Sequence, residues 1–232
     1  MRSLHPVGTR EKFVASGIYK HFEQGEATGT LERWSIHELP DGAQIIRVDE
    51  DWRERDGSSI LVEAWRSPQG KIERFDLHAM GGKADEIKDV RATFTFGDGL
   101  LEIGRSVDHA ERQYLEMIIP EPYIASPKSL LFSGFEVMDL AAQPESAIIS
   151  YFPTFVSEDT AFKPVAYRQG ITHVADEIIL DLTDKAHNAR RYTQHPPASN
   201  HIWLDRYGVL IKFSSPDGAH SAILSQYARR PD

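Results

Sequence analysis

The residues of this chain that could do chemistry are histidines, acidic side chains and one pair of arginines. Cysteine is absent, which excludes disulfides, thiolate metal sites and a cysteine nucleophile. The patterns Gly-x-Ser-x-Gly, Gly-x-x-x-x-Gly-Lys-Ser/Thr, Gly-x-Gly-x-x-Gly and His-Glu-x-x-His are absent as well. The sequence therefore carries no catalytic signature, and we expect no catalytic residue, metal or cofactor.

Histidine is frequent, with ten residues, and the densest group is His187, His195 and His201, with Asp205 nearby. A zinc or iron site would need two histidines and a carboxylate to converge. The chain has no His-x-His pair, the spacing that metal sites on strands often use. We expect solvated or singly hydrogen-bonded histidines, with a metal site as the alternative.

An acidic run comprises Asp49-Glu50-Asp51, followed by Glu54 and Asp56. We interpret it as a solvated strand end and loop. The alternatives are a site for a hard cation or a carboxylate pair for acid–base work. The pair Arg190-Arg191 could bind an anionic head group, but cations on an exposed strand explain it more simply.

One pattern occurs twice, in segments 65–75 and 203–213: Trp, Gly, an aliphatic residue, a cation and Phe at the same spacing. The glycines predict two hairpins. A loop of two or four residues would place Trp65 opposite Ile72 and Trp203 opposite Leu210. Each hairpin would then have one apolar core face and a second face bearing an indole, an aliphatic side chain and a cation.

This second face has two interpretations. It could be a surface Trp covered by the stem of a cation, or it could line the mouth of a cavity suited to a fatty acid or another anionic amphiphile. A slip of one residue would exchange the two faces. The second interpretation gives these candidate ligand-binding residues: Trp65, Ile72, Arg74, Trp203, Leu210, Lys212 and Arg191.

Strand patterns dominate the elements that must position these residues. Segment 90–96, for example, alternates apolar and polar residues, which is typical of a strand with one buried face. Strands are predicted over 13–22, 28–39, 43–52, 59–66, 71–78, 90–96, 100–103, 113–119, 146–152, 164–168, 172–182, 189–194, 201–205, 209–213 and 219–227.

Segment 127–141 differs, because its apolar residues recur at helical spacing and Ser126-Pro127 fit the N-cap and first helical position. Gly134 weakens this prediction by about 1 kcal/mol relative to Ala. The expected fold is mainly β: a large curved antiparallel sheet or half-barrel built from two related meanders, with this helix at its centre. We expect one domain over 1–232, with pseudo-halves of about 1–125 and 145–232.

The composition limits the partners. A net charge of −9 argues against nucleic acid, which binds through clustered cations, and against an anionic membrane surface. No segment approaches the ~20 apolar residues of an integral membrane segment. The N-terminus has no apolar stretch of the kind found in signal peptides, which favours the cytoplasm, or the periplasm if the sequence is a processed form.

Segments 188–193 and 201–213 resemble the C-terminal meander of uncharacterised bacterial proteins related to the lipoprotein-carrier type of open β-barrel, and 41–48 resembles the early strands of that group. The resemblance implies a strongly curved sheet whose concave face is covered by helical segments and carries a lipidic ligand. It implies no catalytic residue.

These observations favour non-enzymatic binding or carriage of a hydrophobic or amphipathic small molecule. One alternative is a hydrolase or isomerase with a histidine and carboxylates in the cavity of the same scaffold. A second alternative is a structural or oligomerisation module whose sheet edges or Trp faces pair between chains.

Overall fold

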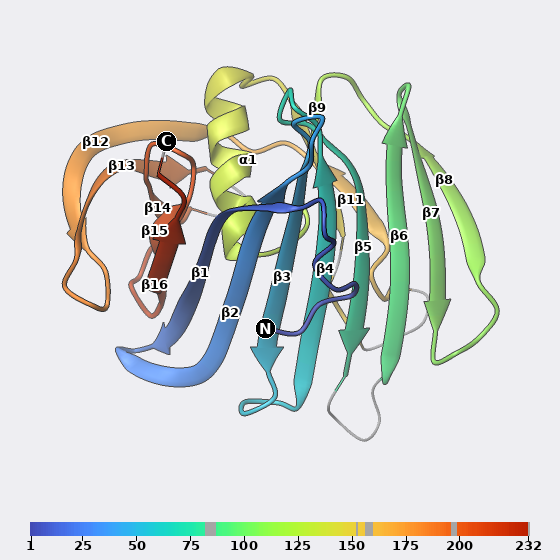
Figure 1. Cartoon of the computed structure of the whole chain (residues 1–232), viewed down its shortest axis with the longest axis horizontal. Coiled ribbons are helices and arrows are strands. Elements are labelled where there is room, and N and C mark those ends of the chain that lie inside the picture. The colour runs from blue at the N-terminus through green and yellow to red at the C-terminus, as the bar shows by residue number, and fades with distance from the viewer. Residues whose placement is uncertain (82–86, 152, 156–159, 196–198, 232) are drawn as a thin grey trace.

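The computed structural model describes the whole chain except residues 82–86, 152, 156–159, 196–198 and 232 (Figure 1). Within the described residues, most of the predicted strands form one 13-stranded sheet whose neighbouring strands run antiparallel. Its strands are β1 (Lys12–Glu23), β2 (Glu26–Glu38), β3 (Gln44–Trp52), β4 (Ser58–Arg66), β5 (Ile72–Met80), β6 (Asp89–Gly97), β7 (Leu100–Val107), β8 (Gln113–Ile118), β12 (Ile171–Leu180), β13 (Ala186–Gln194), β14 (His201–Leu204), β15 (Leu210–Ser214) and β16 (His220–Arg229).

The order of the strands joins the two ends of the chain. The C-terminal meander β12–β16 meets the N-terminal meander β1–β8 where β16 pairs with β1. Figure 1 shows the sheet curving around the helix, and it is not closed: β12 and β8 are its end strands among the described residues. The predicted mainly β class, with a large curved antiparallel sheet and one helix, is confirmed. Both end strands carry exposed apolar side chains, so pairing between chains stays a prediction.

A smaller sheet comprises β9 (Tyr123–Ala125), β10 (Ala147–Tyr151) and β11 (Pro164–Tyr167). β9 runs parallel to β10, and β11 is antiparallel to it. The sequence did not predict β9, because three residues are too few to display a strand period. The strand predicted over 146–152 is confirmed as β10, although residue 152 lies outside the described residues. We call the concave face of the large sheet, which this small sheet and α1 cover, the inner face.

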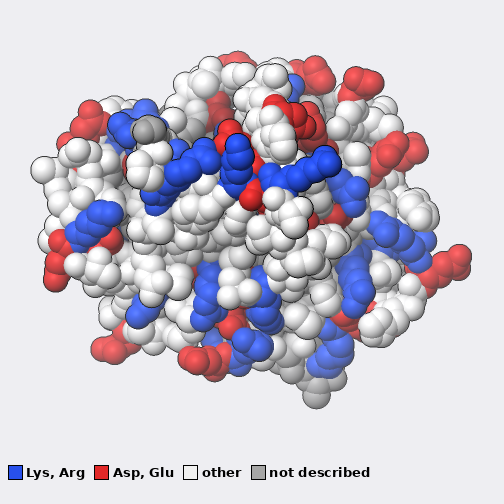
Figure 2. All heavy atoms as spheres, in the orientation of Figure 1, with Lys and Arg blue, Asp and Glu red and all other residues white. Residues whose placement is uncertain are grey.

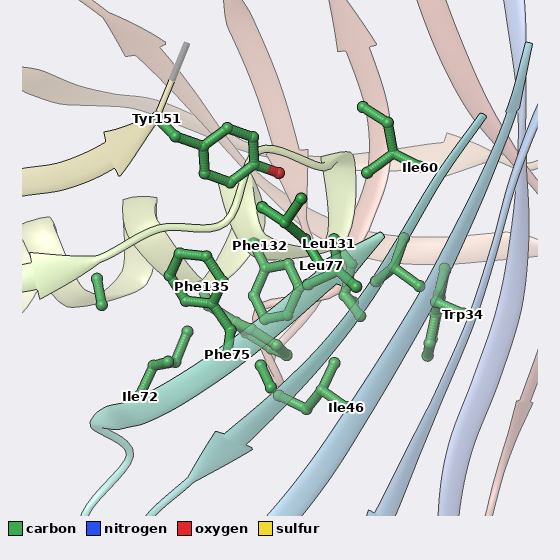
Figure 3. Packing of buried hydrophobic residues seen from close by; sticks show 14 of the residues in the cluster. Trp34, Ile46, Ile60, Ile72, Phe75, Leu77, Leu131, Phe132, Phe135 and Tyr151 are labelled. Atoms are coloured by element: carbon green, nitrogen blue, oxygen red, sulfur yellow. The ribbon is translucent and has the colours of Figure 1, made fainter. Parts of the chain in front are cut away.

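The main core lies between the inner face and its cover. Figure 3 shows Leu131, Phe132 and Phe135 of α1 packed toward Phe75 and Ile46 of the large sheet. The rings of Phe75 and Phe94 stack with their centroids 4.4 Å apart, and Tyr151 of β10 contacts both. Phe75 and Phe94 share one face of the large sheet because they are direct partners across β5 and β6.

The helix α1 (Leu130–Ala142) begins three residues later than the predicted start at 127. Ser129, not Ser126, is the N-cap, and its side chain accepts a hydrogen bond from the backbone N–H of Phe132. The first two N–H groups of the helix, those of Leu130 and Leu131, donate hydrogen bonds to the carboxylate of Glu32 on β2. The predicted start of the helix, with Ser126 as N-cap, was therefore wrong. The hydrogen bonds to Glu32 come from a residue distant along the chain, and such contacts have no local sequence pattern.

The opposite, outer face of the large sheet is crossed by the N-terminal segment 1–11 (Figure 1). Arg2 pairs with Asp49 at 2.6 Å, and the buried Arg47 pairs with Glu11 at 2.6 Å and with Glu63 at 2.8 Å. Lysine and arginine side chains form rows across this view of the surface (Figure 2). Buried carboxylates on the outer face therefore have cationic partners.

Gly134 has a packing role, since α1 approaches the β14–β15 turn closely at this residue. A Cβ placed on Gly134 would lie 2.3 Å from the carbonyl oxygen of Gly208 and 3.3 Å from Leu204 Cδ2. The glycine that weakens the helix prediction is thus the residue that lets the helix sit against the sheet.

Replacing Gly134 with Ala is expected to lower the free energy of unfolding by about 1–3 kcal/mol, because the new methyl group collides with backbone. Urea denaturation of the wild type and the variant measures the difference. Helix propensity alone predicts the opposite, a gain of about 1 kcal/mol, and such a gain would contradict the close packing.

Candidate functional site

A cavity of about 480 Å³ opens between the inner face of β1–β4, the start of α1 and segment 153–155. Its apolar lining comes from Trp52, Ile60, Leu130, Pro153 and Phe155. Its polar lining includes His21, Glu32, Glu50, Ser58, Asp56 and Lys128. A concave, largely apolar space with a few convergent polar groups is the usual form of a small-molecule site.

Glu32 and Glu50 lie side by side in the wall of this cavity. They are directly paired across β2 and β3, so their side chains leave the sheet on the same face. That face is the inner one, because Trp34 and Val48, two positions further along the strands, are core residues. Glu32 is 2% exposed and Glu50 is 8% exposed. Two buried carboxyl groups therefore share one cavity wall.

Glu32 is tied to the start of α1. Its two carboxylate oxygens accept hydrogen bonds of 2.8 Å and 3.0 Å from the backbone N–H groups of Leu130 and Leu131. A helix N-terminus stabilises negative charge, but burial acts in the opposite direction and dominates. Burial raises the pKa of Glu32 to about 7, and the helix hydrogen bonds limit the rise.

Glu50 lacks such partners. Its Oε1 is buried without a hydrogen bond to any described residue. Burial first, and then the nearby charge of Glu32, hold the pKa of Glu50 well above its ordinary value, although a hydrogen bond from Trp52 opposes this. Burial therefore favours the neutral form of the Glu50 carboxyl over the charged form, which would place an unpaired charge in the cavity wall.

His21 adds a neutral imidazole to the cavity. Its ring lies beside the indole of Trp52, with centroids 5.9 Å apart. Burial, aided by the charge of Arg55, lowers the pKa of His21 to about 4. The lysine of the lining, Lys128, is exposed at the rim. In the described part of the chain, neither Glu32 nor Glu50 forms an ion pair with a basic side chain.

The predicted register of the two repeated hairpins is wrong. Trp65 pairs with Arg74, not Ile72, and Trp203 pairs with Lys212, not Leu210. Each loop has three residues and ends in a glycine with positive φ. Next to each loop the strand pairing contains a bulge, between Trp65 and Arg66 in the first hairpin and between Trp203 and Leu204 in the second. The odd loop and the bulge each shift the register by one residue. Ile72 and Leu210 consequently turn into the core.

The remaining candidate residues lie on the outer face. Arg74 lies over the Trp65 ring at 5.1 Å, and Lys212 lies over the Trp203 ring at the same distance. Trp203 also donates a hydrogen bond to Glu177, which forms an ion pair with Arg191. None of the seven candidate ligand-binding residues lines the large cavity, so the structure does not bring them together there.

The histidines do not converge. His187 pairs with Asp181 at 2.9 Å, His195 contacts Thr172, and His201 contacts Thr193. Among the described residues, no group of three or more His, Asp or Glu side chains has an arrangement that could hold a metal ion.

The acidic run is a mixture of environments. Asp49 and Asp51 form ion pairs with Arg2 and Arg53, whereas Glu50 points to the opposite face and lines the cavity. The alternation of a strand could have flagged Glu50 as inward-facing. Glu32 was missed, since a single glutamate in a strand pattern carries no signal of its own.

Comparison of the sequence with known protein families and with curated proteins gives no match. Among solved structures, the fold is similar to the crystal structure of a beta-barrel-like protein of the domain of unknown function DUF1849 from Brucella abortus. The TM-score is 0.56 at 9% identity, over 96% of this chain and 100% of that chain. The similarity concerns the fold, and it agrees with the expected resemblance to an uncharacterised bacterial β-barrel-like protein. No helix within the described residues has the length and hydropathy to cross a membrane.

Glu50 makes the stability of the protein depend on pH. A carboxyl whose folded pKa is raised contributes stability below its unfolded pKa of about 4.5, and this contribution is lost as the pH rises through the folded value. Glu50→Gln removes the titration. The melting temperature of this variant, relative to wild type, is therefore expected to rise as the pH increases above the ordinary glutamate pKa of about 4.5.

Thermal unfolding of the two proteins at several pH values measures this difference. Glu73→Gln removes an exposed carboxylate of β5 and serves as the matched control, with no pH-dependent difference expected. A pH-independent offset for Glu50→Gln would show that Glu50 ionises normally.

Proposed function

We propose that this protein binds a small amphipathic molecule in the cavity beside the start of α1, without chemical conversion. The observation that carries the proposal is the cavity itself: about 480 Å³, with a lining surface that is mostly apolar. Its volume falls within the ~300–1,000 Å³ of typical ligand pockets.

The architecture supports this proposal. A strongly curved sheet has a concave apolar face that must be covered. Here α1 and the small sheet cover much of it, and the cavity lies where that cover begins, next to Leu130. Trp52 and Phe155 provide apolar contact area, while Glu32 and Glu50 provide polar groups within the same lining. Such a combination suits a ligand with an apolar body and one polar end.

Binding of a neutral fluorescent probe tests the proposal. N-phenyl-1-naphthylamine is expected to bind and to gain fluorescence, and native mass spectrometry of the freshly purified protein is expected to show co-purified ligand. Ser58→Phe places a ring into the cavity and should weaken probe binding by at least about tenfold, because the ring occupies the space of the ligand.

Ser106→Phe is the matched control, since Ser106 is a half-buried strand serine on β7 outside the cavity. It should leave probe binding unchanged. Absence of probe binding to the folded wild type, or equal binding by Ser58→Phe, would reject the proposal.

A second candidate function is acid–base catalysis, favoured by His21, Glu32 and Glu50 lining one cavity with shifted pKa values. A glutamate with a pKa of about 7 suits a general base or acid at neutral pH. A panel of chromogenic esters tests for hydrolase activity. Activity with an inflection near pH 7 that Glu32→Gln abolishes would support an enzyme, and inactivity across the panel leaves binding as the better account.

A further inference from the structure

We infer that the cavity selects ligands whose polar end is an organic ammonium group, held by the carboxylate of Glu50 beside Glu32. The inference rests on the proposed binding function and adds the charge of the ligand. It reverses the anionic amphiphile that the repeated hairpins led us to expect.

The ion pairs of other buried carboxylates show which kind of partner the described residues do not provide for Glu50. Three other buried carboxylates have basic partners: Asp49 pairs with Arg2, Glu63 with Arg47, and Asp181 with His187. Two further buried carboxyl groups, those of Asp205 and Glu136, have hydrogen-bond partners in place of a basic side chain. Glu50 is also buried, yet no described basic side chain pairs with it, and its Oε1 has no hydrogen-bond partner among the described residues. A ligand cation would supply the partner that the protein itself supplies at the other sites.

Glu50 is also the free acceptor of the two glutamates. Both oxygens of Glu32 already accept backbone hydrogen bonds from α1, whereas Glu50 Oε1 has no partner among the described residues. An ammonium group has several N–H donors and no acceptor, so it can satisfy this oxygen. Glu32 adds negative charge beside it, because the two residues are direct partners across β2 and β3.

The other charged groups of the lining lie at the rim of the cavity, away from Glu50 in the wall. Asp56 and Lys128 are both exposed at the rim, so one acidic and one basic side chain lie there. Solvent screens the charge of an exposed lysine much more than it screens a charge inside the cavity. Phe155 and Trp52, whose ring already has Arg55 5.7 Å from its centroid, offer apolar area to the body of the ligand.

A metal ion fits this lining less well than an organic cation. Calcium requires six to eight oxygen ligands, and magnesium retains several waters. The described residues contain no cluster of three or more metal-binding side chains, and most of the cavity lining is apolar. An alkylammonium compound would match both the carboxyl end and the apolar wall.

Three ligands of equal length separate charge from hydrophobicity: octylammonium, octanol and octanoate. Calorimetric titration at neutral pH and low salt is expected to give the tightest binding for octylammonium, at least about tenfold tighter than octanol, with octanoate weakest. Glu50→Gln is isosteric and should reduce the preference for octylammonium over octanol to about threefold or less. Glu73→Gln, the exposed control, should retain the full preference.

The outcomes are distinct. Equal affinity for octylammonium and octanol in the wild type would overturn the inference while leaving the binding function intact. Failure of all three to bind would overturn the proposed function as well. If Glu50→Gln does not fold, the order of affinities in the wild type still decides, and stronger stabilisation by calcium chloride than by octylammonium would also overturn the inference.

Discussion

The contact between Glu32 and the start of α1 links the two layers of this protein. A strand of the large sheet provides the carboxylate, and the helix provides the N–H groups of Leu130 and Leu131 that its own backbone cannot satisfy. The contact fixes where the helix begins above the concave face. It also leaves a space beside Lys128, Ser129 and Leu130, where the helix begins, and that space is the cavity. Position of the helix, burial of Glu32 and shape of the cavity therefore share one cause.

Buried acidic side chains have different partners on the two faces of the large sheet. On the outer face, buried acids meet arginines, including Arg47 between Glu11 and Glu63. On the inner face, the Glu32 carboxylate accepts hydrogen bonds from helix N–H groups, and burial raises the pKa of Glu50, which favours its neutral form. A carboxyl held protonated in an apolar wall is costly to ionise. A cation that binds beside such a carboxyl stabilises its ionised form, because ionisation and pairing then occur together.

Much of the fold could be predicted from the sequence. Alternation of apolar and polar residues located the strands of the large sheet, and helical spacing located α1, since both signals are local. The pairing of β16 with β1 lies beyond local signals, because the two strands come from opposite ends of the chain. The register of the repeated hairpins failed for a different reason. Bulges beside Trp65 and Trp203 add residues that no turn pattern announces.

The site was harder to predict than the fold. The repeated Trp and cationic residues were predicted as ligand-binding residues, but they contact one another on the outer face. Glu50 lay hidden in an acidic run, and only its strand parity separates it from Asp49 and Asp51. Glu32 and His21 are ordinary polar positions in strand patterns. The cavity arises from the curvature of the sheet and from a helix start capped from a distant strand, and neither has a local sequence signature.

The proposed preference for an ammonium ligand depends on Glu50, a buried carboxyl for which the described residues provide no basic partner. Carbon NMR of protein labelled at glutamate carboxyl groups, with Glu50→Gln to assign the resonance, follows its titration directly. The account predicts a pKa well above the ordinary value in the free protein, and a fall of that pKa when octylammonium is added. An ordinary pKa in the free protein, or a raised pKa that octylammonium leaves unchanged, would contradict it.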